Sequence, residues 1–162
     1  MKVLIGLDDS PHSRVTLEFV QKMSWPAETR MLVVSSRVSE ATSFGAYEPS
    51  SAVTAAGMVE RIRESQEERV ARSQKKLTEG GLDAEGRVIE GDPRQALLEE
   101  AKQEGVDLIV VGSHGRTGLE KLLMGSVASH VVAHAPCSVL VYDRARAKVK
   151  EAPRNFLKDR AR

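Results

Sequence analysis

The chain has 162 residues, which suits one domain with one hydrophobic core. Charged residues make up 29% of the sequence and hydrophobic residues 41%, as is ordinary for a soluble globular protein. No apolar run approaches the roughly 18 residues that a membrane span needs, and acidic residues follow the N-terminus too early for a signal peptide. With a single cysteine, Cys137, no internal disulfide can form, so we expect a protein of the reducing cytoplasm with no membrane partner.

The formal net charge of +1 conceals an uneven distribution along the chain. Residues 143–162 carry eight Lys or Arg and three Asp or Glu, so residues 1–142 have a net negative charge. We therefore predict a single domain over 1–142 and a basic C-terminal extension over 143–162. The domain has no basic footprint typical of a specific nucleic-acid site, although the extension can attract anionic partners.

The first part of the chain alternates between apolar runs and an amphipathic segment. Residues 2–7, KVLIGL, and 30–35, RMLVVS, are short apolar runs, typical of strands that a parallel sheet buries on both faces. Between them, residues 11–23 carry apolar side chains at helical spacing. Either residue of the Asp-Ser pair before this helix can cap it, and the proline that follows suits its first turn.

A long connection and a charged helix follow. Residues 36–57 are rich in Ser, Ala and Thr and show no convincing period, so we interpret them as either a functional flap or a disordered segment. From 58 to about 78 the chain is charged and predicted to be helical, and Gly80-Gly81 stops the helix. The sparse inner stripe of this helix consists of Val59, Ile62, Val70 and Leu77.

The remaining elements again alternate between strands and helices. Residues 84–90 alternate apolar and polar side chains, which predicts a strand at an edge of the sheet. After it, the sequence Gly-Asp-Pro starts a helix that buries Ala96, Leu97 and Ala101 and ends at Gly105. The last three elements are a buried strand over 107–111, a helix over 126–135 and a strand over 138–142.

This alternation predicts an α/β fold, with one parallel five-stranded sheet and helices on both of its faces. The two early strands and the strand over 107–111 are the most apolar, so we expect them to lie centrally. In such sheets ligands bind beyond the carboxyl ends of the strands, at the point where the strand order reverses. The residues that follow these strands are therefore the first place to look for a site.

The most informative stretch is residues 107–127, DLIVVGSHGRTGLEKLLMGSV. Its strand stops abruptly at Gly112, and two further glycines follow at a spacing of three. Farther on, Gly125-Ser126 stand where a helix begins, and free N–H groups at a helix start attract phosphate. We interpret the stretch as an anion cradle at the end of a buried strand. The alternative is that the glycines only make tight turns.

At these residues the chain resembles the universal stress protein family, whose nucleotide-binding, ATP-binding members carry the motif Gly-x2-Gly-x9-Gly followed by Ser or Thr. Gly112, Gly115, Gly125 and Ser126 match this motif completely. The resemblance covers about residues 1–142. It implies a Rossmann-like sheet of the adenine nucleotide α-hydrolase type with strand order 3-2-1-4-5, so that the order reverses between the first and fourth strands.

The resemblance also implies an ATP site, with Mg2+ accompanying the triphosphate. In nucleotide-binding relatives the carboxylate that ends the first strand lies near the ribose and adenine, which implicates Asp8, with Leu7 beside it. The end of the second strand frames the base, which implicates Ser36. The positions that correspond to the ribose- and phosphate-binding part are Val111, Gly112, Gly115, Gly125, Ser126 and Val127.

Some of the candidate side chains have a simpler explanation. Asp8 can merely cap the following helix, although Asp9 and Ser10 can take that role and leave Asp8 freer for a ligand. Arg116 lies inside the glycine motif and can pair with phosphate, or be an ordinary solvated loop arginine. His114 can likewise touch phosphate or point to solvent.

Several catalytic and metal-binding signatures are missing from the sequence. It has no GxxxxGK[ST] P-loop, no GxGxxG fingerprint and no GxSxG elbow, so we expect a protein that is not an enzyme, apart from slow ATP hydrolysis. His130 and His134 are four apart on one helix face, but no third zinc ligand or HExxH pattern accompanies them. We therefore expect solvated histidines and no dedicated metal site.

The sequence leaves three functions open. We favour an ATP-binding universal-stress-type protein that acts as a nucleotide-dependent sensor or regulator in the stress response. The preferred nucleotide stays open, because ADP, AMP and cyclic AMP contain the same adenosine that the crevice would bind. The alternatives are a nucleotide-independent interaction module that uses its basic tail, and a slow ATPase. The resemblance further implies a homodimer formed by pairing of the fifth strands. Its interface residues would be Val139, Leu140, Val141 and Tyr142.

Overall fold

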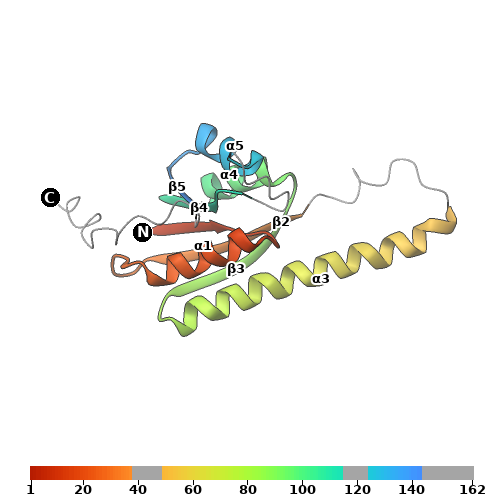
Figure 1. Cartoon of the computed structure of the whole chain (residues 1–162), viewed down its shortest axis with the longest axis horizontal. Helices are drawn as coiled ribbons and strands as arrows, with labels where there is room; N and C mark the ends of the chain where they lie inside the picture. Colours follow the sequence, from red (N-terminus) through yellow and green to blue (C-terminus); the bar gives the residue numbers. More distant parts are fainter. Residues whose placement is uncertain (38–48, 115–123, 144–162) are drawn as a thin grey trace.

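The computed structural model describes residues 1–37, 49–114 and 124–143, which form one parallel five-stranded sheet with its helices (Figure 1). The strands are β1 (Lys2–Gly6), β2 (Arg30–Arg37), β3 (Asp83–Glu90), β4 (Leu108–Gly112) and β5 (Ser138–Tyr142). Their order is β3-β2-β1-β4-β5. The predicted α/β fold is thereby confirmed, with the most apolar strands in the centre of the sheet and β3 at an edge.

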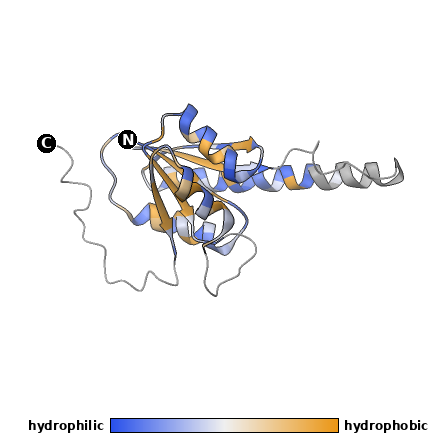
Figure 2. Cartoon of the chain, turned by 90° about the horizontal axis from the view of Figure 1, so that it is seen from above, coloured by the Kyte–Doolittle hydropathy of each residue, from blue (hydrophilic) through white to orange (hydrophobic). Residues whose placement is uncertain are grey.

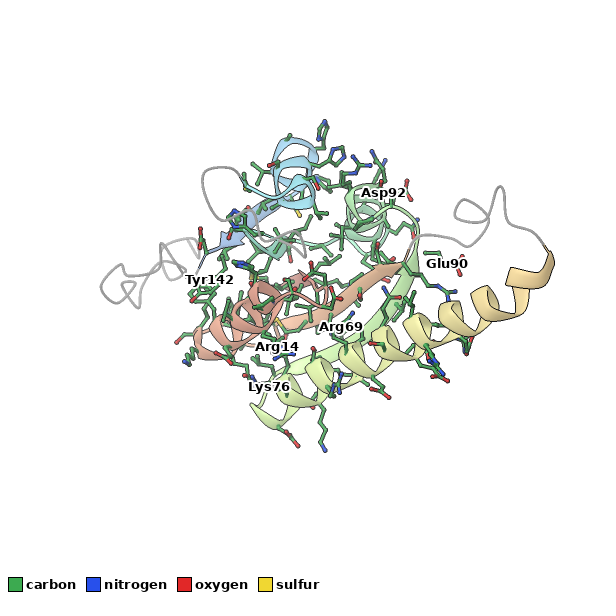
Figure 3. The ribbon with its side chains drawn as sticks, turned by 45° about the vertical axis from the view of Figure 1, so that its right-hand side comes forward. Arg14, Arg69, Lys76, Glu90, Asp92 and Tyr142 are labelled. Atoms are coloured by element: carbon green, nitrogen blue, oxygen red, sulfur yellow. The ribbon has the colours of Figure 1, made fainter. Side chains whose placement is uncertain are left out.

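Helices cover both faces of this sheet. They are α1 (Pro11–Lys22), α3 (Pro49–Glu79), α4 (Pro93–Gln103) and α5 (Ser126–His134). On one face α1 and α3 lie side by side, and Gln21 Nε2 of α1 donates to the backbone oxygen of Lys76 of α3 over 2.7 Å. Arg14 of α1 and Arg69 and Lys76 of α3 mark this face in Figure 3. The other two helices, α4 and α5, pack on the opposite face.

Alternation along the strands sends successive side chains into two hydrophobic clusters. Val3 and Ile5 of β1 are fully buried with side chains of α1 and α3, whereas Leu4 between them is buried with side chains of α4 and α5. Figure 2 shows hydrophobic strands inside and helices with hydrophilic outer faces. Burial on both faces explains why the central strands are continuous apolar runs in the sequence. Among the described residues, no helix is long and apolar enough to cross a membrane.

The predicted helix boundaries have visible physical causes. Ser10 caps α1, because its Oγ accepts a hydrogen bond from the Ser13 N–H over 3.2 Å. Asp92 caps α4 in the same way, accepting from the Arg94 N–H over 2.9 Å, and in both helices a proline occupies the first turn. After α3 the chain turns at Gly81 with φ of +83°, a conformation that glycine adopts most readily.

The prediction for residues 36–57 is wrong in its second half. α3 begins at Pro49, so the segment before 58 belongs to a helix of 31 residues and not to a flap or a disordered connection. Its alanines favour a helix, and adding turns to a helix that is already packed costs little once nucleation has occurred. β2 also runs on to Arg37, beyond its predicted end. Residues 38–48 lie outside the described part of the chain.

The inner stripe predicted for α3 is correct only where the helix reaches the sheet. Val70 and Leu77 are 4% and 0% exposed, but Ile62 is 60% exposed, so its assignment to the core is wrong. The 31 residues of α3 extend about 46 Å at about 1.5 Å per residue, whereas the eight residues of β3 extend roughly 26 Å. The first part of α3 therefore projects beyond β3 (Figure 1). The side chain of Val59 lies outside the described residues.

Candidate nucleotide-binding site

The carboxyl ends of β1, β2 and β4 meet at one edge of the sheet. Gly6, the last residue of β1, lies level with Val34 of β2 on one side and with Val111 of β4 on the other. Because β1 and β4 are neighbours in space but not in sequence, the strand order reverses between them. The implicated residues that the structure brings to this edge are Leu7, Asp8, Ser36, Val111, Gly112, Gly125, Ser126 and Val127. Gly115 and Arg116 lie outside the described residues.

Asp8 follows β1 and supports the cap of α1. Its Oδ1 accepts hydrogen bonds from the Ser10 N–H at 3.0 Å, the Ser10 hydroxyl at 2.5 Å and the Ser13 hydroxyl at 2.6 Å. The Asp8 N–H donates in return to Ser13 Oγ over 2.9 Å. Ser10 is the N-cap residue, as the sequence allowed, but Asp8 is not released by it, because Asp8 Oδ1 holds Ser10 and Ser13 in place. Oδ2 of Asp8 receives none of these three hydrogen bonds.

Gly112 ends β4 directly against α1. A Cβ atom at this position would lie 3.2 Å from His12 Cβ and 3.3 Å from Thr16 Oγ1, tighter than ordinary side-chain contacts. The absence of a side chain therefore allows the end of β4 and the first turns of α1 to approach each other. This gives Gly112 a packing reason in addition to the motif that it belongs to.

Ser113, which follows β4, is hydrogen-bonded to the end of β5 and to the start of α5 at the same edge of the sheet. Its N–H donates to the backbone oxygen of Tyr142 at the end of β5 over 2.9 Å, and its own backbone oxygen accepts from the Gly125 N–H over 2.8 Å. Its hydroxyl forms a hydrogen bond with His114 Nδ1 over 3.0 Å, and the residue is 5% exposed. Sequence reasoning missed Ser113. The available signal was a polar residue directly after a buried strand, inside the glycine motif.

The start of α5 lies beside the end of β4 because of the hydrogen bond from Gly125 to Ser113. Gly125 is the N-cap residue and has no side chain that could satisfy the N–H groups of the first turn. Ser126 is exposed and Val127 is half-buried. Free N–H groups and the positive end of the helix dipole make such a helix start favourable for an anion.

Ser36 lies at the far end of this edge, where β2 meets α3. Gln66 of α3 donates from Nε2 to the backbone oxygen of Ser36 over 3.0 Å, and the Ser36 hydroxyl donates to the backbone oxygen of Gly91 over 3.1 Å. The end of β2 is thus fixed from both sides, by α3 and by the turn after β3. Figure 3 labels Glu90 and Asp92, which flank that turn.

Two buried side-chain atoms have no hydrogen-bond partner in the part of the chain that the structure describes. They are Gln66 Oε1 and His114 Nε2. The His114 ring also faces the ring of His12, with centroids 5.3 Å apart. A buried polar atom left without a partner costs about 1–3 kcal/mol, and native proteins leave few of them. His114 follows the carboxyl end of β4, and Gln66 of α3 is hydrogen-bonded through its Nε2 to Ser36, near the carboxyl end of β2.

Across residues 1–37, 49–114 and 124–143, no three His, Cys, Asp or Glu side chains are grouped so that they could hold a metal ion. His130 and His134 stack on each other, with ring centroids 4.2 Å apart. The Nδ1 atom of His134 lies 2.9 Å from the backbone oxygen of His130, whose Nε2 lies 3.3 Å from Gln95 Nε2. His134 is exposed and His130 is half-buried.

Solved structures share this architecture. Hypothetical protein MJ0577, from Methanocaldococcus jannaschii, superposes with a TM-score of 0.73 and 23% identity over 93% of this chain and 97% of that one. A universal stress protein family protein from Arabidopsis thaliana with AMP bound gives 0.60 and 20%, over 93% and 97%. The universal stress protein from Archaeoglobus fulgidus in complex with dAMP gives 0.59 and 18%, over 88% and 98%. At identities this low, the TM-scores establish a common fold and no more.

Sequence relatives point to the same group. Universal stress protein MJ0531 of Methanocaldococcus jannaschii is 39% identical over 82 residues, which are 51% of this chain and 48% of that protein, so the match spans about half of its length. Universal stress protein A homolog 2 of Coxiella burnetii is 32% identical over 142 residues, 86% of this chain and 92% of that one. The model of the universal stress protein family matches residues 1–143. The chain therefore belongs to the universal stress protein family.

Proposed function

We propose that this protein binds ATP in the crevice between β1 and β4 and acts as a nucleotide-dependent sensor or regulator in the stress response. The observation that supports this most is the 2.8 Å hydrogen bond from the Gly125 N–H to the Ser113 backbone oxygen. It holds the start of α5, which lacks a side-chain cap, beside the end of a central strand. An anion at that point would meet free N–H groups and approachable backbone together.

The ligands of structural neighbours support an adenine nucleotide. The Arabidopsis thaliana protein has AMP bound and the Archaeoglobus fulgidus protein is a complex with dAMP. Both ligands share the adenine base and a 5′-phosphate with ATP. We extend the proposal to a triphosphate because the complete glycine motif, with Arg116 inside it, offers more anion-binding groups than one phosphate needs.

Each site residue has a role in this proposal that follows from its position. Asp8 Oδ2 accepts from the ribose, with the backbone of Leu7 beside it, and Ser36 frames the base. At the other side, the N–H groups of Ser126 and Val127 donate to phosphate oxygens. A Mg2+ ion bound with the triphosphate would neutralise its charge, held by phosphate oxygens and by the Ser126 hydroxyl, which suits a hard cation.

We infer that the nucleotide is a ligand rather than a rapidly consumed substrate. Phosphoryl-transfer sites position a cation on the γ-phosphate, usually the lysine of a P-loop, and the sequence contains no P-loop. Slow hydrolysis, with Asp8 or His114 orienting a water molecule, is the alternative. Phosphate release from clean wild-type protein decides between them, since a rate that disappears in Asp8→Ala while ATP remains bound would establish turnover.

We also propose a cytoplasmic homodimer formed through β5. This strand is at an edge of the sheet, and its residues Val139, Leu140, Val141 and Tyr142 are half-buried in the single chain. Tyr142 stacks on Phe19 of α1, with ring centroids 4.3 Å apart, so its ring is already partly used within the chain. A β5 edge that pairs with a second copy is protected from aggregation. Sedimentation equilibrium on wild-type protein and on Val141→Lys tests the pairing.

Calorimetric titration of the purified chain tests the proposed function. ATP with and without Mg2+, ADP, AMP and cyclic AMP would be compared in protein shown to be folded and free of carried-over ligand. We expect micromolar affinity for ATP. If no nucleotide gives measurable binding, the proposal is contradicted and a nucleotide-independent interaction protein is favoured.

A further inference from the structure

One ring nitrogen of His114 is buried but forms no hydrogen bond with the described residues. Its Nδ1 is engaged by the Ser113 hydroxyl over 3.0 Å, whereas its Nε2 is buried and has no hydrogen-bond partner among the described residues. The contacts that the described chain makes with this ring use Nδ1 but not Nε2. The unused nitrogen therefore indicates a partner that is not part of the described chain.

The position of this ring is as informative as its missing partner. His114 follows β4, and His12 lies in the first turn of α1, which follows β1. Their rings face each other across the point where the strand order reverses, with centroids 5.3 Å apart and planes tilted by 43°. Gly112 permits this approach, because its missing Cβ would lie 3.2 Å from His12 Cβ. The His114 ring is thus in contact with Ser113, which follows β4, and with His12 of α1, so residues on both sides of the crevice position it.

The chemistry of imidazole narrows the kind of partner. When the Ser113 hydroxyl donates to Nδ1, the ring carries its hydrogen on Nε2, and when the ring is an imidazolium both nitrogens donate. In both forms Nε2–H needs an acceptor. An anionic phosphate oxygen is a strong acceptor and favours these two forms over the remaining tautomer. The proposed ligand brings several such oxygens to this edge of the sheet.

We propose, on the basis of the proposed nucleotide site, that His114 is a phosphate-binding residue whose Nε2–H donates to an anionic oxygen of the bound nucleotide. Ser113 fixes the ring through Nδ1, and His12 supports it from α1 as a positioning residue. No covalent bond forms or breaks in this step. The side chain of His114 thereby adds discrimination for phosphate to a site whose other contacts are largely made by backbone.

The test compares ATP with adenosine by calorimetry in wild-type protein, His114→Phe and His130→Phe. Phenylalanine keeps the ring volume at 114 but removes both nitrogens. We expect His114→Phe to bind ATP roughly tenfold more weakly, or worse, and adenosine within about twofold of wild type, as for the loss of one charge-assisted hydrogen bond. The matched control, His130→Phe, replaces a histidine of α5 whose Nε2 lies 3.3 Å from Gln95 Nε2 of α4, and it should leave both affinities unchanged.

Three outcomes decide against the inference. Full ATP affinity in folded His114→Phe would refute it and leave the nucleotide site intact. An equal loss for ATP and adenosine would show that the ring only supports the crevice. If wild-type protein binds neither compound, the proposed function fails and the inference fails with it, which separates this case from the first two.

A second measurement holds even if His114→Phe does not fold. The ring nitrogens of wild-type protein can be followed by two-dimensional NMR as ATP or adenosine is added. We expect the His114 Nε2 resonance to move with ATP and to remain in place with adenosine, while the His130 and His134 resonances remain in place with both. An unmoved His114 ring in ATP-saturated protein would overturn the assignment.

Discussion

The two ends of the sheet differ in how completely their polar groups are paired. Toward the amino ends of the strands, side chains of opposite charge form ion pairs with one another. Lys2 Nζ lies 2.9 Å from Glu104 Oε2, and Arg87, from the middle of β3, reaches the same Glu104 at 2.8 Å and Glu100 at 2.6 Å. Hydrogen bonds from Lys2 and then from Arg87 lower the pKa of Glu104 to about 2. Hydrogen bonds to Glu85 and Glu104 in turn raise the pKa of Arg87.

The carboxyl edge also contains ion pairs, Arg37 with Glu90 and Arg94 with Asp92, but some of its polar groups are left without partners. There His114 Nε2 and Gln66 Oε1 are buried without partners in the described part of the chain, and Asp8 uses one carboxylate oxygen for the cap of α1. α5 begins at the same edge with a glycine as its cap residue. Hydrogen-bonding capacity is therefore left over at this end of the sheet.

This difference shows why a hollow surface alone does not identify a site. A cavity of about 310 Å³ lies at the amino ends, where two of its lining residues, Lys2 and Glu104, are already paired with each other. Its lining residues are Lys2, Arg30, Met31, Leu32, Asp83, Glu85 and Glu104. Among the described residues, the carboxyl edge contains two buried side-chain atoms without a hydrogen-bond partner, Gln66 Oε1 and His114 Nε2. Four substitutions test this comparison, from the largest expected effect to the smallest.

Gly125→Val should weaken ATP binding about 100-fold or more, because a branched side chain would occupy the space beside the first turn of α5. The fold should survive, since Gly125 has φ of −57° and ψ of 154°, which valine adopts readily. Calorimetry gives the affinity and urea unfolding gives the stability. Gly57→Val, at an exposed position of α3, is the control and should leave affinity unchanged. Equal affinities in the two variants would refute the phosphate position.

Asp8→Ala should weaken ATP binding about tenfold and reduce the free energy of unfolding by about 1 kcal/mol, because the residue both faces the ligand and supports the cap of α1. Asp92→Ala removes a capping carboxylate from α4 instead and serves as the matched control. It should cost a similar stability and leave ATP affinity intact. The idea of a dual role fails if both variants bind ATP equally well.

Arg87→Met should separate stability from binding, because it removes the guanidinium from the ion-paired cluster around Glu104. Removing the guanidinium leaves Glu100, whose side chain is 10% exposed, without its partner. We expect the free energy of unfolding to fall by about 1–2 kcal/mol, less than for a fully buried pair, because Arg87 is 37% exposed and water screens it. Affinity for ATP should not change. A large loss of ATP binding would contradict the distinction between the two ends.

Glu104→Gln should alter how stability depends on pH. The pKa of Glu104 is about 2 in the folded chain and near 4.5 when unperturbed, so its ion pairs stabilise the fold above pH 4.5. That contribution is lost progressively as the pH falls from 4.5 to 2. Urea midpoints measured from pH 6 to pH 2 should therefore fall less steeply in the variant than in wild type. Parallel curves would show that Glu104 contributes no proton linkage.

Local sequence signals predicted most of the fold. Buried apolar runs identified the strands. Ser10 and Asp92 mark where helices begin and Gly81 follows the end of one, for reasons that lie within a few residues of each boundary. The order of the strands came from the resemblance, because no local pattern encodes which strands pair. Ile62 shows the limit, since its spacing fits the inner face of α3 but the sheet ends before it.

The candidate site was only partly predictable for a related reason. The motif pointed to Gly112 and to the start of α5, and the structure brings them to one edge. The sequence left the orientation of His114 open and did not predict its contact with His12, which lies about a hundred positions away. Whether a side-chain atom is left without a partner depends on every element packed around it, so only the assembled chain reveals it.

Backbone amide NMR of the labelled wild-type chain during a titration with ATP tests the central claim most directly, because it reports on both ends of the sheet at once. We expect the largest shifts at the carboxyl edge, at Asp8, Gly112, Ser113, Ser126 and Val127, and none around the ion pairs of Lys2, Arg87 and Glu104. Shifts concentrated on the ion-paired amino end, with the carboxyl edge unmoved, would contradict the account.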